Sequence, residues 1–328
     1  MAKRICIFKE GEIVSTKHAL ALVADENYLE YTKQVIAGSY IHGNWDGAYI
    51  LIAFDIDPEK LRWFKDRGIY IFHAEPLITA SIRYNKAKDW PVVVYAKLYL
   101  FHPFFTQWDK VLYLDTDIII RKDIRGLMNH LRFAAREESM GQDMLYQFVP
   151  DMLYLNKAHQ QAIEALPYDL KTTSFNVGVM VVPTQNNTIA NFEKLTALAN
   201  ELHGLAYFPE QAVLNAFFYK NWDNIPYVYN DLYVHDWFHQ RKDDRDAVIL
   251  HLVGNNKPWN TNSPYYSEWN DMYAKADDCF DCKQVGQQPD LKRVNNIERL
   301  NLRMKWLGKF GWWWWHAKAR IRNVFSGR

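Results

Sequence analysis

Short apolar runs alternate with longer segments of mixed polarity along the first half of the chain. Residues 18–24, 48–54 and 69–72 have the length and hydrophobicity of buried strands, whereas 28–39 and 58–67 place apolar side chains at helical spacing. Strands that alternate with helices imply right-handed βαβ crossovers and a mainly parallel sheet. The sequence therefore predicts an α/β domain whose ligands bind at the carboxyl ends of the strands.

The middle of the chain extends this pattern. Apolar or aromatic residues recur at helical spacing from Val93 to Trp108, and the strand that begins at Lys110 ends in Asp115-Thr-Asp117. Asp123 is a candidate cap of a short helix, and the weak periodicity of 139–173 predicts a long, lid-like insertion. The remaining predicted elements are strands at 175–182 and 248–253 and helices at 189–202 and 210–219.

The composition is that of a folded, water-soluble protein, because 49% of the 328 residues are hydrophobic and 23% are charged. Lys plus Arg number 39 against 38 for Asp plus Glu, so no global field attracts nucleic acid, and no nucleic-acid-binding motif occurs. Three cysteines form no disulfide framework and indicate a reducing compartment, and Cys279 and Cys282 lack the second pair that a zinc site needs. Without a signal-peptide pattern or a run of about 20 apolar residues, we expect a cytoplasmic protein whose membrane contact is peripheral.

A change of pattern after Pro264 divides the chain into a main domain, 1–275, and a basic, aromatic tail, 276–328. From residue 291 to 328 ten basic residues accompany one acidic residue, so this stretch carries a charge of +9 and the remainder −8. Indole rings favour lipid headgroups and basic side chains favour anionic lipid, so we expect a helical tail that attaches to an anionic membrane surface. A dimer interface or a solvated helical face is the alternative. The aromatic residues of the basic stretch 291–328 are Trp306, Phe310, Trp312, Trp313, Trp314, Trp315 and Phe325.

Asp115 and Asp117 are the most informative pair of residues. Side chains two apart on a strand point the same way, about 6.6 Å apart along it, so both carboxylates can meet one hard cation. Two carboxylates at the end of an apolar strand cost free energy unless a positive charge compensates them. A divalent ion supplies that charge, and as a Lewis acid it can also bind a diphosphate. A lone D-x-D also occurs in capped turns, but its position after the buried run 111–114 favours a metal site.

A second polar cluster follows the last predicted strand, in His251-Leu-Val-Gly254-Asn-Asn-Lys257-Pro-Trp259. A histidine at a strand end offers a neutral nitrogen, which suits Mn²⁺ better than Mg²⁺. Gly254 permits close approach of a ligand to the backbone, and Lys257 brings a positive charge to a phosphate. His251 alone has the pattern of a core histidine, whereas the three residues together predict a loop that binds metal and phosphate.

Six segments of the chain, taken in order, resemble the family 8 retaining glycosyltransferases, which include glycogenin and bacterial lipopolysaccharide α-galactosyl- and glucosyltransferases. The segments are Val23-Ala-Asp-Glu-Asn-Tyr28, Tyr95-Ala-Lys-Leu98, Lys110-Val-Leu-Tyr-Leu-Asp-Thr-Asp117, Phe175-Asn-Val-Gly-Val-Met180, Glu210-Gln-Ala-Val-Leu-Asn215 and His251-x-x-Gly-x-x-Lys-Pro-Trp259. The resemblance implies a GT-A fold, which is a Rossmann-like, mixed and mainly parallel sheet flanked by helices. It also implies a UDP-sugar as the donor.

By this resemblance Asp115, Asp117 and His251 hold Mn²⁺, with Mg²⁺ as the other candidate ion, against the diphosphate of the donor. The resemblance also implies a uridine pocket, in which a carboxylate accepts from the uracil N3–H and an aromatic ring stacks on the base. The alternative is that two of its polar residues cap the helix that follows. The residues of the implied pocket are Ala24, Asp25, Asn27 and Tyr28.

The resemblance assigns further residues to the donor sugar. Lys97 lies near the sugar and its diphosphate, with a solvated helix lysine as the alternative. Asn176 and Gln211 match amides that contact the sugar, with a strand-edge turn and an exposed helix position as their alternatives. Asp143 corresponds to a carboxylate that binds donor hydroxyls. Glu210 departs from the family, many of whose members have Asp there, and the added methylene displaces the carboxylate.

The implied reaction moves a hexose from UDP-glucose or UDP-galactose to a glycan or lipid-linked saccharide with retention at the anomeric carbon. Such a reaction fits the synthesis of cell-surface polysaccharide or lipopolysaccharide. Mn²⁺, Lys257 and Lys97 would stabilise charge on the departing diphosphate. By resemblance Gln211 lies nearest C1, and an amide is a poor nucleophile, so we favour same-face attack over a covalent intermediate on Glu210.

Other functions and an oligomeric state stay open. A self-glucosylating primer and a non-catalytic sugar-nucleotide-binding protein share these motifs. A nucleotidyltransferase needs a Gly-rich, basic triphosphate loop after its first strand, and Asp25-Glu-Asn is acidic there.

Overall fold

The computed structural model describes residues 17–79, 90–139, 142–150, 154–232, 244–254 and 257–278. The tail lies outside these ranges except for its first three residues, and so do Cys279 and Cys282. The division near residue 275 and the attachment of the tail to a membrane therefore stay predictions. Within the described ranges, no helix combines the length and hydrophobicity that crossing a membrane requires.

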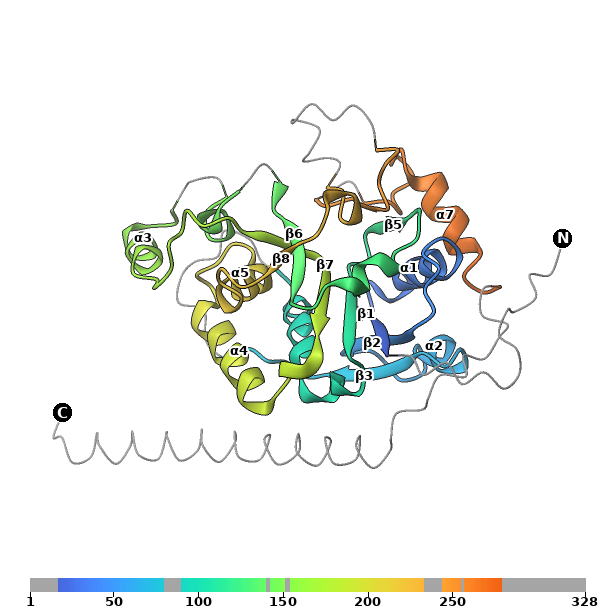
Figure 1. The fold of residues 1–328 in the computed structure, drawn as a ribbon, viewed down its shortest axis with the longest axis horizontal. Coiled ribbons are helices and arrows are strands. Elements are labelled where there is room, and N and C mark those ends of the chain that lie inside the picture. The colour runs from blue at the N-terminus through green and yellow to red at the C-terminus, as the bar shows by residue number, and fades with distance from the viewer. Residues whose placement is uncertain are drawn as a thin grey trace. The chain divides into compact units, whose positions relative to one another are not determined.

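A seven-stranded sheet forms the centre of the described residues (Figure 1). Its strands are β1 (His18–Ala24), β2 (Ala48–Phe54), β3 (Tyr70–Ala74), β4 (Lys110–Leu114), β6 (Ala134–Glu137), β7 (Phe175–Pro183) and β8 (Asp223–Asn224). The order is β3-β2-β1-β4-β7-β6-β8, in which the first four strands are parallel. β7 runs antiparallel to β4 and β6, and β8 is parallel to β6. The prediction of a mixed, mainly parallel α/β sheet is confirmed.

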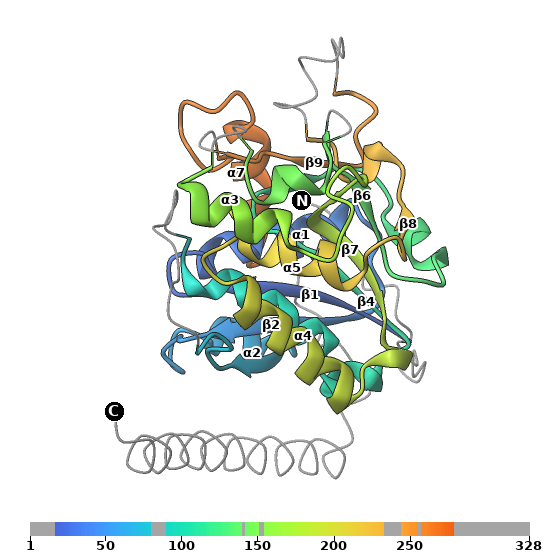
Figure 2. The same cartoon turned by 90° about the vertical axis from the view of Figure 1, so that its left-hand side faces the viewer.

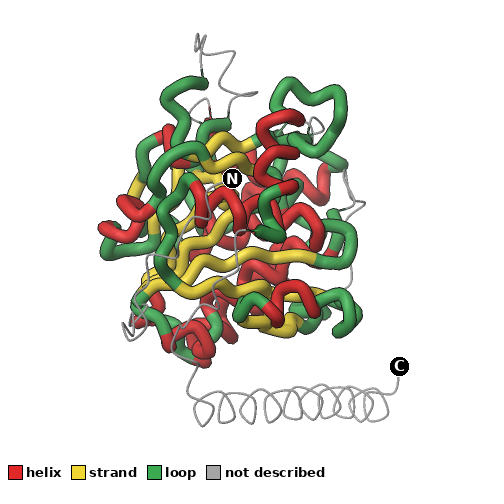
Figure 3. Tube along the Cα trace, turned by 90° about the vertical axis from the view of Figure 1, so that its right-hand side faces the viewer, coloured by secondary structure: helices red, strands yellow, loops and turns green. Residues whose placement is uncertain are grey.

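Helices cover both faces of this sheet, as the tube in Figure 3 shows. The central strands are apolar along their whole length because neither face meets water. The main helices are α1 (Leu29–Ile41), α2 (Arg62–Asp66), α4 (Ile189–Leu202), α5 (Pro209–Phe217) and α7 (Tyr266–Ala274). In Figure 1, α1 and α7 lie on one side of β7 and α4 and α5 lie on the other. Figure 2 shows β4 beside β7, with which it pairs.

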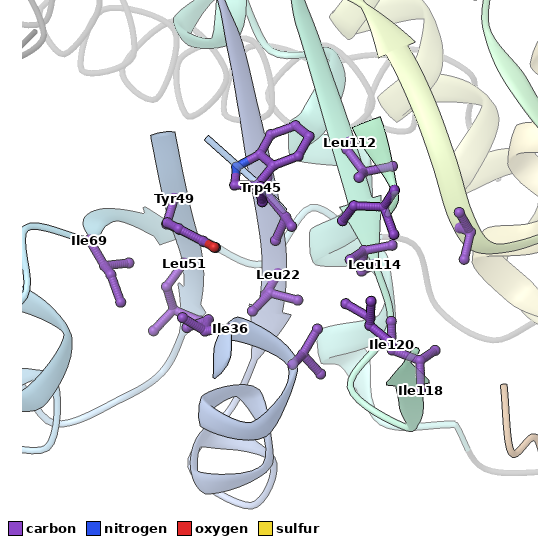
Figure 4. Packing of buried hydrophobic residues seen from close by; sticks show 14 of the residues in the cluster. Leu22, Ile36, Trp45, Tyr49, Leu51, Ile69, Leu112, Leu114, Ile118 and Ile120 are labelled. Atoms are coloured by element: carbon purple, nitrogen blue, oxygen red, sulfur yellow. The ribbon is translucent and has the colours of Figure 1, made fainter. Parts of the chain in front are cut away.

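The face that α1 covers holds every second residue of the parallel strands (Figure 4). Leu51 of β2, Leu22 of β1 and Leu114 of β4 pack there with Ile36 of α1. Residues at the intervening strand positions point to the opposite face, where the 3₁₀ helix η1 (Val92–Phe101) contacts β1 and β2.

A second sheet of two antiparallel strands brings distant parts of the chain together. Its strands are β5 (Ile118–Ile120) and β9 (Ile249–His251), and Ile118 pairs with His251. β5 follows β4 directly after the turn Asp115–Asp117. The pairing therefore places the histidine beside the two aspartates.

Two sequence expectations are corrected by the structure. The helical segment from Val93 to Trp108 is not one regular α-helix but two 3₁₀ helices, η1 and η2 (Pro103–Gln107). Pro103 begins the second helix, and a proline lacks the N–H that a continuous helix needs there. Asp115 and Asp117 occupy a turn rather than consecutive same-face positions of one strand, so their convergence depends on the turn.

Several short elements were not predicted. β5, β6 and β8 are two to four residues long, which is too short for alternation to identify them. α7 follows Pro264, where the main domain was expected to be ending. Asp123 accepts the N–H of Arg125 (2.9 Å), but the N-cap residue of the 3₁₀ helix η3 (Arg125–Asn129) is Ile124, which makes no side-chain cap, so Asp123 is not the cap that was predicted. The described parts of the insertion 139–173 contain the 3₁₀ helix η5 (Met144–Gln147) and α3 (Lys157–Glu164).

Leu51 of β2 provides a test of the core beneath α1. Leu51→Ala removes a side chain that is 0% exposed and leaves a cavity, so we expect the free energy of unfolding to fall by about 2–5 kcal/mol. The matched control is Leu131→Ala, because Leu131 is 74% exposed, and this change should shift stability by less than about 0.5 kcal/mol. Urea unfolding measures both variants, and equal losses would contradict this placement of Leu51.

Candidate metal and catalytic site

The turn Asp115–Asp117 lies between the main sheet and the small sheet, at the carboxyl end of β4. Asp115 donates its backbone N–H to the carbonyl oxygen of Gly178 on β7 (2.8 Å). On the other side, the carbonyl oxygen of Asp117 accepts the N–H of Leu252, which follows β9 (3.0 Å). Backbone hydrogen bonds from both sheets therefore hold the two carboxylates in place.

The structure brings Asp115, Asp117 and His251 together. One ligand atom from each residue lies within 4.8 Å of the other two. Nε2 of His251 is 3.1 Å from Oδ1 of Asp117 and 3.9 Å from Oδ2 of Asp115. Two carboxylates and an imidazole form a donor set that suits a divalent cation such as Mn²⁺. The side chains present therefore fit the metal that the sequence predicts.

Gly178 on β7 makes room for the histidine ring. A Cβ atom at this position would lie 2.2 Å from Cε1 and 2.6 Å from Nδ1 of His251. Both distances are far below van der Waals contact, so the ring packs directly on the backbone of the strand. This close approach accounts for a glycine inside an otherwise apolar central strand.

Lys97, on η1, is buried between two carboxylates. Its Nζ lies 2.9 Å from Oδ1 of Asp115 and 3.2 Å from Oε1 of Glu210. Burial alone would lower the pKa of Lys97, but attraction to both carboxylates outweighs burial and raises that pKa. The hydroxyl of Tyr113 also donates to Oδ1 of Asp115 (2.5 Å), and burial raises the pKa of this tyrosine. Lys97 is only 8% exposed, so the alternative of a solvated helix lysine is wrong.

Lys257 pairs with the other carboxylate, that of Asp117. Burial alone would raise the pKa of Asp117, but the neighbouring side chains of His251 and Lys257 hold that pKa well below its usual range. The charged side chains of the group are three carboxylates and two ammonium groups. They belong to Asp115, Asp117, Glu210, Lys97 and Lys257. With the histidine neutral, one net negative charge is left, which favours binding of a cation.

The side-chain amide of Gln211, in the first turn of α5, makes all its hydrogen bonds to other groups of the protein. Its Nε2 donates to Oε2 of Glu138 (2.8 Å) and to Oε1 of Gln147 (2.7 Å). Its Oε1 accepts from Nδ2 of Asn176 (3.3 Å) and from the backbone N–H of Val177 (3.2 Å). An amide offers two donors and two acceptor positions, and all four are filled. Gln211 is 7% exposed, so the alternative of an exposed helix position is wrong.

The turn after β1 places Tyr28 beside the metal group. Oδ1 of Asp25 accepts the N–H groups of Asn27 (3.0 Å) and Tyr28 (3.1 Å), so this carboxylate caps the turn that precedes α1. The Tyr28 ring lies edge to face with that of Trp259, two residues after Lys257, with 5.9 Å between the ring centroids. Burial raises the pKa of Tyr28. The ring is 36% exposed and is accessible for stacking.

Three other residues were predicted to contact the donor. Ala24 is the buried last residue of β1. Asp143 caps η5 by accepting the N–H of Tyr146 (3.3 Å), so its contact with donor hydroxyls stays a prediction. Gly254 has a φ of +82°, and no heavy atom of the described residues outside its chain neighbours lies within 4 Å of the position that a Cβ would occupy. Its backbone is therefore open to a ligand.

Comparison with known proteins identifies the family. The model described as glycosyl transferase family 8 matches residues 19–263, which is most of the chain. The chain belongs to glycosyl transferase family 8. The matched region begins in β1 and includes Asp115, Asp117, His251 and Lys257, so all the metal and phosphate candidates of this family 8 protein lie within it.

Curated relatives of this family 8 protein are identical to it at about a quarter of the aligned positions. Glycosyltransferase GlyF of Streptococcus pneumoniae is 26% identical over 264 residues, which cover 75% of this chain and 58% of GlyF. A lipopolysaccharide 1,2-glucosyltransferase of Escherichia coli is 26% identical over 211 residues, 61% of this chain and 58% of the enzyme. Galactinol synthase 1 of Arabidopsis thaliana is 23% identical, with coverage of 75% and 76%. The matches to the first two proteins thus span less than two thirds of their lengths.

Two solved structures share the fold of this family 8 protein. The galactosyltransferase LgtC, determined with donor and acceptor sugar analogs, has a TM-score of 0.59 and 17% identity, and the match covers 78% of this chain and 95% of LgtC. GlyE of Streptococcus pneumoniae has a TM-score of 0.56 and 19% identity, with coverage of 83% and 66%. At these identities the similarity concerns the fold, and the predicted GT-A fold is confirmed.

Some residues of the family 8 site were not predicted from the sequence. Tyr113 was detectable in principle, because residues two apart on a strand share a face and it precedes Asp115 by two. Glu138 and Gln147 both accept from Gln211, but Glu138 follows β6 and Gln147 ends η5, and both segments carry weak sequence patterns. Asn230 contacts His251 from a segment whose local sequence gives no such signal.

Gly178→Ala tests the packing of the histidine against β7. The added methyl group must displace the His251 ring, so we expect affinity for Mn²⁺ to fall by roughly 10–100-fold. In the control Gly38→Ala, the nearest atom lies 3.6 Å from the new Cβ, and this helix position should gain up to about 1 kcal/mol. Electron paramagnetic resonance of free Mn²⁺ and thermal unfolding measure the two effects. Unchanged Mn²⁺ affinity in folded Gly178→Ala would contradict the close approach.

Proposed function

We propose that this family 8 protein transfers a hexose from a UDP-sugar to a saccharide hydroxyl with retention at the anomeric carbon, and that it requires a divalent cation, Mn²⁺ by preference. The observation that carries this proposal is the convergence of Asp115, Asp117 and His251, flanked by Lys257 and Lys97. A cation in this group would neutralise the charge that develops on the departing diphosphate.

The residues around the metal group supply the remaining contacts of the proposal. Lys257 carries a positive charge next to Asp117, and the open backbone at Gly254 precedes it in the same loop. The exposed ring of Tyr28 offers a surface for the uracil base. Asp25 supports the loop through its capping contacts, so its part in uridine binding is to fix the backbone as well as to accept a hydrogen bond.

The hydrogen bonds of the site support same-face attack over a covalent glycosyl intermediate. Gln211 is the residue placed nearest C1 by the family resemblance, and its amide is fully engaged within the protein. Glu210 carries a carboxylate, but that carboxylate pairs with Lys97 at 3.2 Å, which reduces its nucleophilicity. The proton of the acceptor hydroxyl then goes to the departing phosphate oxygen as the new C–O bond forms.

The names of the relatives support the finer substrate classes of the proposal. They include a lipopolysaccharide glucosyltransferase, a galactosyltransferase and galactinol synthases, so UDP-glucose and UDP-galactose are the first donors to test. A glycan or lipid-linked saccharide is the proposed acceptor, in cell-surface polysaccharide or lipopolysaccharide synthesis. Location at the cytoplasmic face of a membrane belongs to the same proposal and has its support in the basic, aromatic tail 276–328.

Replacement of the aspartates tests the metal group. Asp115→Asn and Asp117→Asn each remove a charged ligand that contributes several kcal/mol, so we expect kcat/KM for UDP-sugar turnover to fall by roughly 100-fold or more. UDP release from UDP-glucose and UDP-galactose, with and without Mn²⁺, measures this loss. Asp109→Asn makes the same chemical change at an exposed residue before β4 and should keep full activity. Near-normal turnover by either aspartate variant would refute the proposed site.

Lys257→Ala tests how this lysine acts at the metal group. Lys257 pairs with Asp117 and so competes with a cation for that carboxylate. Without nucleotide we expect the variant to bind Mn²⁺ several-fold more tightly than the wild type, and with UDP present the order should reverse because the diphosphate loses its partner. Isothermal titration calorimetry measures both affinities, and Lys60→Ala, at an exposed ion pair, is the control. An unchanged effect of UDP on Mn²⁺ affinity would show that Lys257 does not contact the diphosphate.

A further inference from the structure

Asn230 lies directly behind the histidine of the metal group. It is 0% exposed, and its Oδ1 is 2.8 Å from Nδ1 of His251. This is the ring nitrogen that faces away from Asp115 and Asp117, since Nε2 is the atom that approaches both carboxylates. Asn230 therefore touches a candidate metal ligand without belonging to the group that would hold the ion.

The backbone around Asn230 is fixed by three separate contacts. Nη1 of Arg136, on β6, donates to the carbonyl oxygen of Asn230 (2.8 Å). The next residue, Asp231, donates its N–H to the carbonyl of Ile249 (2.9 Å) and accepts the N–H of His251 (2.9 Å). Both the asparagine and the histidine are thus attached to one short stretch of paired backbone, which limits the movement of either side chain.

A chain of hydrogen bonds determines which way each side chain is turned. The backbone N–H of Gly178 can only donate, and it points to Oδ1 of Asn176 (2.9 Å), so that atom must be the oxygen. The same oxygen accepts from Nδ2 of Asn230 (3.0 Å), which leaves Oδ1 of Asn230 facing Nδ1 of His251. An amide oxygen accepts, so Nδ1 must carry the proton of the neutral ring. Nε2 then has its lone pair free on the side of the aspartates.

We propose that Asn230 is a positioning residue that holds neutral His251 in the Nδ1–H tautomer, with Nε2 presented to the cation, and that the backbone of Gly178 sets this orientation through Asn176. The inference rests on the metal site of the proposed function. It goes further by assigning a role to a residue outside the group of candidate metal ligands. Partners of this kind orient a ligating ring and are worth about 10–100-fold in metal affinity.

The first test measures the tautomer in the metal-free protein. Two-bond ¹H–¹⁵N spectra of the histidine side chains, recorded at alkaline pH and assigned with His251→Gln, should show the proton of His251 on Nδ1. In Asn230→Ala the preference for Nδ1–H should be lost. A wild-type signal with the proton on Nε2 would overturn the proposal. This measurement needs neither metal nor sugar, so it separates failure of the positioning role from failure of the proposed transferase function.

The second test compares three variants by their affinity for Mn²⁺, measured by electron paramagnetic resonance without nucleotide. Asn230→Ala should weaken binding by roughly 10–100-fold. Asn230→Asp loses the donor to Oδ1 of Asn176 but keeps an acceptor oxygen toward Nδ1. It should bind Mn²⁺ more tightly than Asn230→Ala, because a carboxylate also orients and polarises the ring. Asn187→Ala is the matched control, since Asn187 is a buried asparagine (5% exposed) whose Nδ2 donates to the carbonyl of Leu100 (2.8 Å).

The pattern of the three variants decides between a positioning and a merely structural role. A positioning role is supported if Asn230→Ala loses affinity for Mn²⁺, Asn230→Asp recovers part of that affinity, and Asn187→Ala keeps the wild-type affinity. Equal affinity losses in Asn230→Ala and Asn187→Ala would show a general effect of destabilising the fold and would overturn the proposal. If Asn230→Ala does not fold, the wild-type tautomer and the Asn230→Asp variant still test the proposal. A wild-type ring with its proton on Nε2 contradicts it, and so does an Asn230→Asp variant whose Mn²⁺ affinity is as low as that of His251→Gln.

Discussion

Mutual repulsion among Asp115, Asp117 and Glu210 is the constraint to which the rest of this site responds. Carboxylates gathered in a partly buried place are unfavourable unless cations lie among them. Lys97 sits between two of the three, and Lys257 pairs with the third. The protein thus supplies enough positive charge to fold with the group assembled, yet leaves one net negative charge to attract a metal.

The strand β7 gives this charged group its shape. It enters the sheet antiparallel to β4 and so brings Gly178 and Asn176 to the carboxyl end of a parallel strand. Gly178 acts through its missing side chain, since the ring of His251 occupies the space where a Cβ would lie. The amide of Asn176 hydrogen-bonds to Gln211 on one side and to Asn230, the partner of the histidine, on the other. One central strand therefore contacts both the candidate metal ligand His251 and the amide of Gln211 that we propose lies near the sugar.

The polar residues beneath the sugar side form a support rather than a reactive group. Gln211 satisfies all its hydrogen bonds with Asn176, Val177, Glu138 and Gln147. Burial raises the pKa of Glu138, and donors such as the N–H of its neighbouring serine and the amide of Gln211 act against that rise. An amide held on four sides is rigid but chemically inert, which is consistent with a reaction driven by charge stabilisation on the diphosphate.

The sequence by itself determined the parallel half of the sheet, because β1, β2 and β4 are continuous apolar runs separated by helical patterns and need no distant partner to be recognised. It also indicated the metal candidates, since two carboxylates after a buried strand favour a cation site and the family resemblance adds His251 to them. Only the tertiary structure decided how they meet: the antiparallel pairing of β5 with β9 joins Ile118 to His251 across the sequence. It alone revealed Asn230, because hydrogen bonds between residues far apart in the chain leave no periodic signal in either segment.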